Sequence, residues 1–502
     1  MTIEKEIRHK EENSYKNILK RISSFGGVQI FNILITLVRG KFVAMFLGPE
    51  GMGISSLFTS STNTIQQFAG LGLNLAMVRE VASEKDNPEK IPHILSVALS
   101  MILFTATLGG VICFCLSPAL SKWTFGNYDY TISFMALSAA VFLTIGGTGY
   151  LSLLQGMGEV KRLTKASVVG GLTGLCCGVP LYYFFGDAGI VPAMIILALA
   201  IFLFYFLSFR KSVLFDKIKF SWQSHKPIVK KLISLGLILM LGNLVGTFAN
   251  YIINIFVRYF GSVDNVGFFQ AANSLTNQYV GIIFSALALD YFPRLSAACK
   301  DVAKLCNVVN RQSEIVVLIT TPLVLLLILT TPIIIDLLLT EKFLIITPLM
   351  RWLGLGVLFQ AVSFPMGYIF IAKDNKKIYI WIEVVLTTVI WLICSFTFYY
   401  FYGLIGLGIS LVVRASLDIC ITYAVCRKFF GFKYTTKVLA LIIGCLSLGV
   451  GGFAASLLPT TPSYILQSGI FIVSAVFSFL MIKKGVRKDR NENLNSLSTP
   501  KD

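Results

Sequence analysis

The sequence predicts an all-α integral membrane protein with about 14 transmembrane helices. Of its 502 residues, 55% are apolar and only 14% are charged, and the mean hydropathy is +0.77. Because one membrane-spanning helix needs about 20 apolar residues, the apolar residues suffice for about 14 helices and leave little for a soluble domain. This composition argues against a water-soluble enzyme, a disordered or fibrous chain and a disulfide-rich secreted domain.

Apolar stretches of about 19 to 27 residues, the length of a tilted crossing, recur along the chain between charged residues, Gly and Pro. The first six are expected near residues 22–47, 53–78, 93–117, 130–154, 166–184 and 188–208. The next six are expected near residues 232–257, 266–290, 314–339, 345–371, 378–399 and 404–425. The last two are expected near residues 436–457 and 464–482.

Basic residues alternate between the two ends of these helices. If the N-terminus is cytoplasmic, 36 of the 43 Lys and Arg residues lie in cytoplasmic segments and three in outer loops. The positive-inside rule therefore places both termini in the cytoplasm. Because the basic residues are spread along one membrane face, the net charge of +18 does not indicate a nucleic-acid partner.

The domain organisation follows from the loops, none of which is long enough to fold into a catalytic domain. No G-x-x-x-x-G-K-[ST] motif occurs, so the chain carries no ATP-binding module of that type. We expect a cytoplasmic segment (1–21), an N-lobe of six helices (22–208), a cytoplasmic loop (209–231), a C-lobe of six helices (232–425), two further helices (436–482) and a cytoplasmic tail (483–502).

An internal repeat relates the two lobes. Residues 46–83 align with 259–296, and residues 184–190 align with 401–407, which equates helices 1–6 with helices 7–12. Six is an even number, so both copies enter the membrane in the same sense, as parallel repeats do. The aligned positions include Gly48 with Gly261, Gly53 with Gly267, and Arg79 with Arg294.

Basic residues inside helices are candidates for substrate binding, because a charge within the bilayer is costly and usually faces a cavity. Arg39 and Lys41 lie in the first helix, about 200° apart, so only one of them can face such a cavity. Arg414 is close to the middle of helix 12, while Arg258 and Arg351 lie near outer helix ends, where interfacial anchoring is the alternative. This basic surplus favours an anionic substrate, which guanidinium groups bind with paired donors.

Acidic residues offer a second kind of site. Asp418 follows Arg414 by four residues, so a structural ion pair is expected to compete with function there. Asp336, Glu383 and Asp418 are candidates for coupling to protons or sodium, and the choice between these ions stays open. The ten Cys and three His residues form no ligand pattern, so neither a metal site nor another cofactor is expected.

Helix 2 is unusually polar for a spanning segment. Asn63, Gln66 and Gln67 follow a run of Ser and Thr, and Asn277 and Gln278 fall at matching positions in the second repeat. Ser and Thr can bond to their own helix backbone, but amides beside so many hydroxyls favour the wall of a hydrophilic cavity. Such walls would suit a sugar, so these five amides complete the predicted substrate-binding set.

A family resemblance rests on helix 1, Gly48-Pro49-Glu50-Gly51-Met52-Gly53, the polar helix 2, Gly70-Leu71-Gly72 and Val78-Arg79-Glu80-Val81-Ala82. This pattern resembles the O-antigen and polysaccharide flippases, particularly the lipid III flippases. These proteins share the MOP superfamily with the MATE multidrug exporters. The resemblance covers nearly the whole chain.

The resemblance implies two lobes around a central cavity that opens alternately to each side of the membrane. It implies that an undecaprenyl-pyrophosphate-linked oligosaccharide, such as an O-antigen repeat unit, moves from the cytoplasmic to the periplasmic leaflet. Arg39 would then bind the pyrophosphate, with Arg258 and Arg414 as further candidates. The last two helices would hold the lipid tail, and a polysaccharide polymerase or assembly protein would be a partner. The alternative is a MATE-like, cation-coupled exporter of drugs or small solutes.

Overall fold

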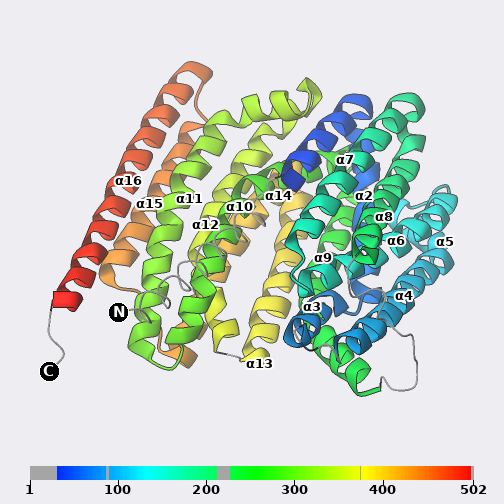
Figure 1. Ribbon diagram of the computed structural model, residues 1–502. Helices are drawn as coiled ribbons and strands as arrows, with labels where there is room; N and C mark the ends of the chain where they lie inside the picture. The colour runs from blue at the N-terminus through cyan, green and yellow to red at the C-terminus, as the bar shows by residue number, and fades with distance from the viewer. Residues whose placement is uncertain (1–30, 86, 88–89, 212–225, 374, 499–502) are drawn as a thin grey trace. The chain divides into compact units, whose positions relative to one another are not determined.

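The computed structural model describes residues 31–85, 87, 90–211, 226–373 and 375–498, and this part of the chain is almost entirely helical, without strands (Figure 1). The predicted segment 1–21 lies outside these residues, as does most of the loop 209–231. Contacts divide the chain into two compact units, Met1–Gly267 and Phe268–Asp502. The helix predicted at residues 232–257, which is the first helix of the second repeat, therefore belongs to the N-terminal unit by its contacts.

The N-terminal unit begins with a helix over residues 31–46. It continues with α2 (Gly48–Ala69), α3 (Leu73–Glu84), α4 (Ile91–Cys115), α5 (Ser117–Phe125), α6 (Thr131–Gly156), α7 (Val160–Phe185), the 3-10 helix η1 (Gly186–Gly189), α8 (Ile190–Arg210) and α9 (Lys226–Phe260). The first turn of α10 (Val263–Ala298) also belongs to this unit.

The C-terminal unit contains the rest of α10. Its other helices are α11 (Val302–Leu338), η3 (Glu341–Ile346), α12 (Thr347–Ala372), α13 (Lys376–Ile378), the π-helix η4 (Tyr379–Leu386), α14 (Thr387–Phe430), α15 (Thr436–Ala455) and α16 (Thr460–Ser498). Helices α15 and α16, the two beyond the repeat, both pack against α11 (Figure 1).

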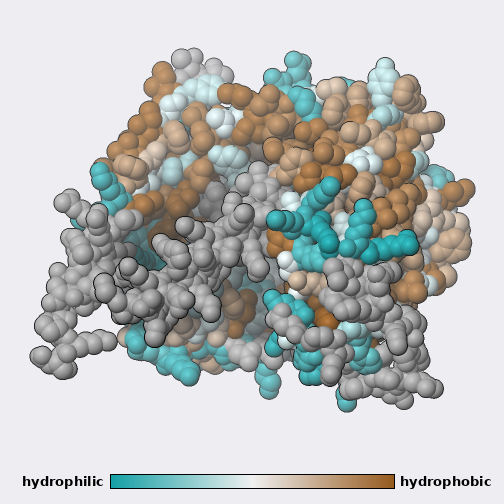
Figure 2. Space-filling model, in the orientation of Figure 1, coloured by the Kyte–Doolittle hydropathy of each residue, from teal (hydrophilic) through white to brown (hydrophobic). Residues whose placement is uncertain are grey.

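Each predicted span coincides with helical structure where the chain is described. Nine described segments are long and apolar enough to cross a membrane, and two of them, 160–210 and 379–430, each contain two predicted spans. The α14 segment turns at Gly403, whose φ of 57° and ψ of −140° are not helical. Apolar side chains cover much of the visible face over α6, α8 and α16 (Figure 2).

Two local expectations from the sequence were wrong. The predicted second span, 53–78, is broken between α2 and α3, because Leu71 and Gly72 both have a positive φ, 51° and 62°. The predicted outer loop between residues 118 and 129 contains most of α5. Pro118 lies in the first turn of this helix, where proline is tolerated, and Gly126, with a φ of 82°, ends it. Apolar patterning alone indicates neither a break inside a spanning segment nor a short helix between two of them.

The turn glycines of the two repeats have the same geometry. Gly186 has a φ of 55° and a ψ of −133°, close to the values at Gly403. Three residues later, Gly189 packs on the carbonyl of Leu181 and Gly406 on that of Phe398, in both cases eight residues back along the chain. The sequence pairing of 184–190 with 401–407 therefore corresponds to one turn structure that occurs twice.

A second pair of repeat glycines meets inside the N-terminal unit. Gly53 of α2 packs on the carbonyl of Val263, and Gly267 of α10 packs on the carbonyl of Pro49. Each contact reaches the residue four positions before the partner glycine, so the two helices use the same surface on each other. A side chain at either position would overlap the opposing backbone, which explains why glycine occupies both.

We predict that Gly406→Ala and Gly189→Ala each lower the free energy of unfolding by about 2 kcal/mol or more, because the added methyl group overlaps a main-chain carbonyl. Thermal unfolding of the purified protein in detergent measures this effect. Gly444→Ala is the matched control, since a Cβ there meets nothing within 4 Å and alanine is the better helix former. An equal loss in all three variants would contradict the packing explanation.

Candidate functional site

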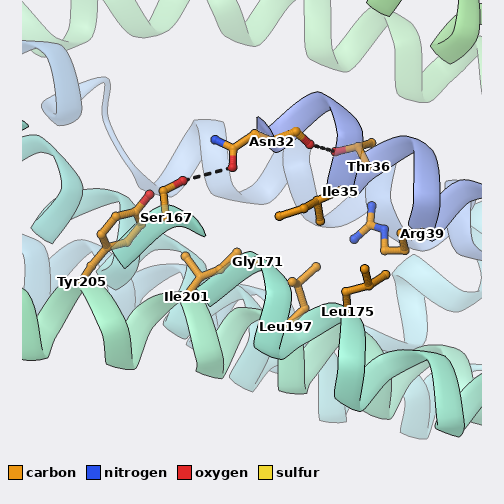
Figure 3. A pocket seen from close by; sticks show the side chains of 10 residues that line it. All are labelled: Asn32, Ile35, Thr36, Arg39, Ser167, Gly171, Leu175, Leu197, Ile201 and Tyr205. Atoms are coloured by element: carbon orange, nitrogen blue, oxygen red, sulfur yellow. Dashed lines mark hydrogen bonds between the residues drawn. The ribbon is translucent and has the colours of Figure 1, made fainter. Parts of the chain in front are cut away.

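A cavity of about 230 Å³ lies inside the N-terminal unit, between the helix over residues 31–46, α7 and α8 (Figure 3). Each helix lines it with one stripe of side chains spaced three or four residues apart, which is the spacing of a single helix face. The lining residues are Asn32, Ile35, Thr36, Arg39, Ser167, Gly171, Leu175, Leu197, Ile201 and Tyr205.

Glycines on α7 explain why this space exists. Gly170 and Gly174 allow α8 to approach closely, since a Cβ at Gly170 would lie 3.2 Å from the Cα of Ile201 and one at Gly174 would overlap Leu197. Gly171 faces the other side, where a Cβ would meet only the tip of Ile35, at 2.9 Å. Gly170 and Gly174 thus allow α7 and α8 to pack closely. The absence of a side chain at Gly171 leaves room for the cavity between α7 and the helix over residues 31–46.

The two ends of the cavity differ chemically. At one end, the Ser167 hydroxyl donates to the Asn32 side-chain oxygen at 3.1 Å, beside the ring of Tyr205 (Figure 3). Arg39 lies at the other end, two turns farther along the helix that carries Asn32, which is about 10 Å at 1.5 Å per residue. Aliphatic side chains line the stretch between, so the cavity offers neutral hydrogen-bonding groups at one end and a positive charge at the other.

Arg39 is half-buried, and within the described ranges no carboxylate forms an ion pair with its guanidinium group. Its five N–H donors are therefore available to a ligand, and their planar arrangement matches the oxygens of a phosphate or carboxylate. Lys41, the other predicted base of this helix, does not line the cavity. Of the two basic residues predicted on this helix, the structure thus places Arg39 in the lining of the cavity.

The polar run of α2 divides into two faces. Ser56, Ser61 and Thr62 are buried, and their hydroxyls donate to carbonyls of their own helix at 2.7 to 2.9 Å. Asn63 is exposed, and Gln66 and Gln67 are half-exposed. None of these amides lines the Arg39 cavity, so the structure does not bring them together with Arg39 in one pocket.

The matching amides of the second repeat bond within α10. Asn277 donates to the side-chain oxygen of Asn273 at 2.9 Å, and Gln278 donates to the Ser274 hydroxyl at 2.7 Å. Asn277, like Asn63, is exposed. Exposing an amide to lipid costs free energy, so a hydrated environment is favoured for both Asn63 and Asn277.

Arg258 and Arg351 both donate to the end of another helix. Arg258 on α9 donates to the carbonyl of Phe125, the last residue of α5, and its guanidinium group fills the space beside Gly126. Arg351 on α12 donates to the carbonyl of Ser456, which caps α15, at 2.9 Å. A positive charge at a helix C-terminus is favourable, so these contacts give both residues a role in stability.

Arg414 lies in the C-terminal unit with two acidic residues. It interacts electrostatically with Asp418 on its own helix and with Glu383 on η4, and it lies 5.5 Å from the centre of the Trp391 ring. The third predicted acid, Asp336, is exposed two residues before the end of α11. No group of three potential metal ligands occurs in the described part of the chain.

Sequence reasoning missed Asn32, Ser167 and Tyr205, which form the polar end of the cavity. Asn32 could have been found, because it is an amide inside a predicted span and lies on the same helix face as Arg39. Ser167 and Tyr205 are single hydroxyl residues in apolar helices, and only the packing of α7 against α8 brings them to the cavity.

Comparison with known proteins shows the family to which this chain belongs. Residues 42–348 match the family described as polysaccharide biosynthesis protein, and the chain belongs to this family. It is 24% identical over 355 residues to a protein of Escherichia coli (strain K12) named lipid III flippase, covering 69% of this chain and 83% of that protein.

Two solved structures have a similar fold. One is the lipid II flippase MurJ in an inward closed conformation, with a TM-score of 0.72, 15% identity and coverage of 92% of this chain and 99% of that chain. The other is a multidrug resistance MATE family transporter of the MOP superfamily in an inward-facing conformation, with a TM-score of 0.68, 19% identity and coverage of 82% and 95%. The protein is therefore a multi-pass membrane protein of the MATE-like fold.

We predict that Arg258→Met and Arg351→Met each lower the free energy of unfolding by about 1–3 kcal/mol, because each leaves a helix-end carbonyl without its charged donor. Arg39→Met, the matched variant, should change it by less than about 0.5 kcal/mol, since no ion pair is lost. Denaturant or thermal unfolding in detergent tests this. A loss for Arg39→Met as large as for the other two would show that Arg39 is structural.

Proposed function

We propose that the protein is a flippase that carries a polyprenyl-diphosphate-linked oligosaccharide across the bacterial inner membrane. Membership of the polysaccharide biosynthesis family and the similarity to a lipid III flippase support a lipid-linked glycan as the substrate class. The observation that carries the proposal is Arg39, whose guanidinium group lines a cavity inside a membrane protein and forms no ion pair with a carboxylate of the described residues. The protein is accordingly a transporter rather than an enzyme.

The cavity fits part of such a substrate. Pockets for drug-sized ligands measure about 300–1,000 Å³, and this one measures about 230 Å³. It is too small for an oligosaccharide but large enough for a diphosphate or one sugar. Arg39 would bind diphosphate oxygens with paired donors, while Asn32 and Ser167 offer hydrogen bonds to the group next to it.

The rest of the substrate would remain outside this cavity. A polyprenyl chain is as apolar as the bilayer and needs no shielding, whereas a charged head group cannot cross hydrocarbon unaided. The exposed amides Asn63 and Asn277 would face the glycan, and α15 and α16 would contact the lipid tail. Alternating access would move the head group from the cytoplasmic to the periplasmic leaflet, with both chain termini in the cytoplasm. A polysaccharide polymerase or another assembly protein would take up the product.

A MATE-like exporter of cationic drugs is the alternative, and the fold is compatible with it. A site for a cation would need a carboxylate without a basic partner, and the cavity in the N-terminal unit is lined by a guanidinium group instead. The charge of the site therefore favours an anionic substrate.

We predict that deleting the gene causes lipid-linked oligosaccharide to accumulate on the cytoplasmic side and surface polysaccharide to disappear. Wild-type protein should restore both. Arg39→Ala should fail, and Arg39→Lys should restore them only in part, because an ammonium group keeps the charge but loses the paired donors. Quantifying the lipid-linked intermediate and the surface glycan measures these outcomes, with membrane levels of each variant checked by immunoblot.

Gly171→Leu offers a second test, because the new side chain fills the cavity beside Ile35 without removing a charge. Gly178→Ala is its matched control on the same helix, since the added Cβ would lie 3.6 Å from that of Ala193, an ordinary contact. Full activity of Gly171→Leu would contradict the assignment of the cavity. Unchanged surface glycan after gene deletion, together with sensitivity to cationic drugs, would favour the exporter.

A further inference from the structure

Three charged side chains of the C-terminal unit interact with one another electrostatically. Glu383 belongs to the π-helix η4, and Arg414 and Asp418 belong to α14. Arg414 attracts both carboxylates, and the two carboxylates repel one another. When all three groups are ionised, the cluster carries one net negative charge.

The hydrogen bonds of the cluster are incomplete. The Oε2 atom of Glu383 and the Nε atom of Arg414 are both buried without a hydrogen-bond partner. Asp418, in contrast, accepts a hydrogen bond from the Thr422 hydroxyl at 3.3 Å. The ion pair expected between Arg414 and Asp418 is not among those found within the described residues, which join Lys90 to Glu84 and Arg162 to Glu159.

This charge balance calls for one bound positive charge. An uncompensated carboxylate inside a membrane protein is costly, and Arg414 stays charged because a guanidinium group does not lose its proton in proteins. A diphosphate would add negative charge to a cluster that already has an excess of it, so Arg414 is a poor site for the substrate. Arg414 also repels a metal cation, and no group of three metal ligands exists in the described ranges.

We propose that Glu383 is a proton-binding site, and that one proton is gained and lost there in each transport cycle. The assignment falls on Glu383 because its Oε2 atom has no donor, whereas the hydroxyl of Thr422 stabilises the charged form of Asp418. A neutral Glu383 would balance Arg414 against Asp418 alone. This inference rests on the proposed transport function, to which it adds the proton gradient as the energy source.

The surroundings of Glu383 can respond to its charge. Its Oε1 atom lies against Gly367 of α12, where a Cβ would be 3.2 Å away. Two residues earlier, Pro365 lies inside α12, and the carbonyl of Pro365 accepts a hydrogen bond from the Tyr291 hydroxyl at 2.7 Å. A π-helix and a proline inside a helix are both places where a helix can repack, so protonation occurs beside two adaptable elements.

The other titratable groups around Glu383 are Tyr379 on η4 and Cys426 on α14, besides Arg414 and Asp418. On α12, Tyr368 follows Gly367 and interacts with Tyr379. Arg414 supplies the positive charge within this set, and the proton is assigned to the carboxyl group whose Oε2 atom has no hydrogen-bond donor.

The experiment is a pH titration of the purified full-length protein in lipid nanodiscs, followed by infrared difference spectroscopy. We expect the C=O stretching band of a neutral carboxylic acid to appear as the pH falls. The chain has 25 Asp and Glu residues, so the contribution of Glu383 is the component of this band that is present in wild type and absent from Glu383→Gln. Glu341→Gln, which removes an exposed acid in η3, should leave that component unchanged, and sodium at constant pH should not move it. Identical bands in wild type and Glu383→Gln, or a Glu383 component that responds to sodium, would overturn the proposal.

A transport assay then separates this inference from the proposed function. Nanodiscs are replaced by liposomes that contain the protein and a lipid-linked oligosaccharide, with or without a pH gradient. The gradient should stimulate flipping by wild type and Glu341→Gln but not by Glu383→Gln. If wild type does not flip the lipid while the Glu383 band still titrates, the proposed function fails and the proton site stands. If wild type flips the lipid and Glu383→Gln responds equally to the gradient, the proton site fails and the function stands.

Discussion

Hydrocarbon provides no hydrogen bonds, so each polar group placed within the bilayer must find its partner inside the protein. This constraint accounts for the helical structure of the described chain and for much of its detail. The Ser and Thr hydroxyls of α2 bond to carbonyls of their own helix. The same constraint makes the exceptions informative, because the described protein leaves the Oε2 atom of Glu383 and the Nε atoms of Arg258, Arg351 and Arg414 buried without a hydrogen-bond partner.

Close helix packing depends on glycine at a few positions, and these positions fall in both repeats. Gly189 and Gly406 allow a turn to fold back on the helix before it, and Gly53 and Gly267 allow two helix starts to meet through their backbones. The same property shapes the site, since Gly170 and Gly174 draw α8 onto α7 while Gly171 leaves the cavity open. Dispersion forces between close backbones replace the hydrophobic effect, which is weak between helices in lipid.

The intramembrane arginines have three different environments, although they look alike in the sequence. Arg258 and Arg351 donate to carbonyls at helix ends. Arg414 lies between two carboxylates and an indole ring. Arg39 lines the cavity of the N-terminal unit. The surroundings of each guanidinium group, rather than its depth in a helix, distinguish these four residues.

Apolar length and turn glycines are local properties, so the sequence alone sufficed to predict the class of protein, most of the spanning helices and the internal repeat. It also singled out Arg39 and the charged residues of helices 11 and 12. Which charges have partners depends on how the helices pack, since the carbonyls of Phe125 and Ser456 lie far from Arg258 and Arg351 in the chain. The cavity was equally out of reach, because Ser167 and Tyr205 become neighbours of Asn32 only when three separate helices pack together.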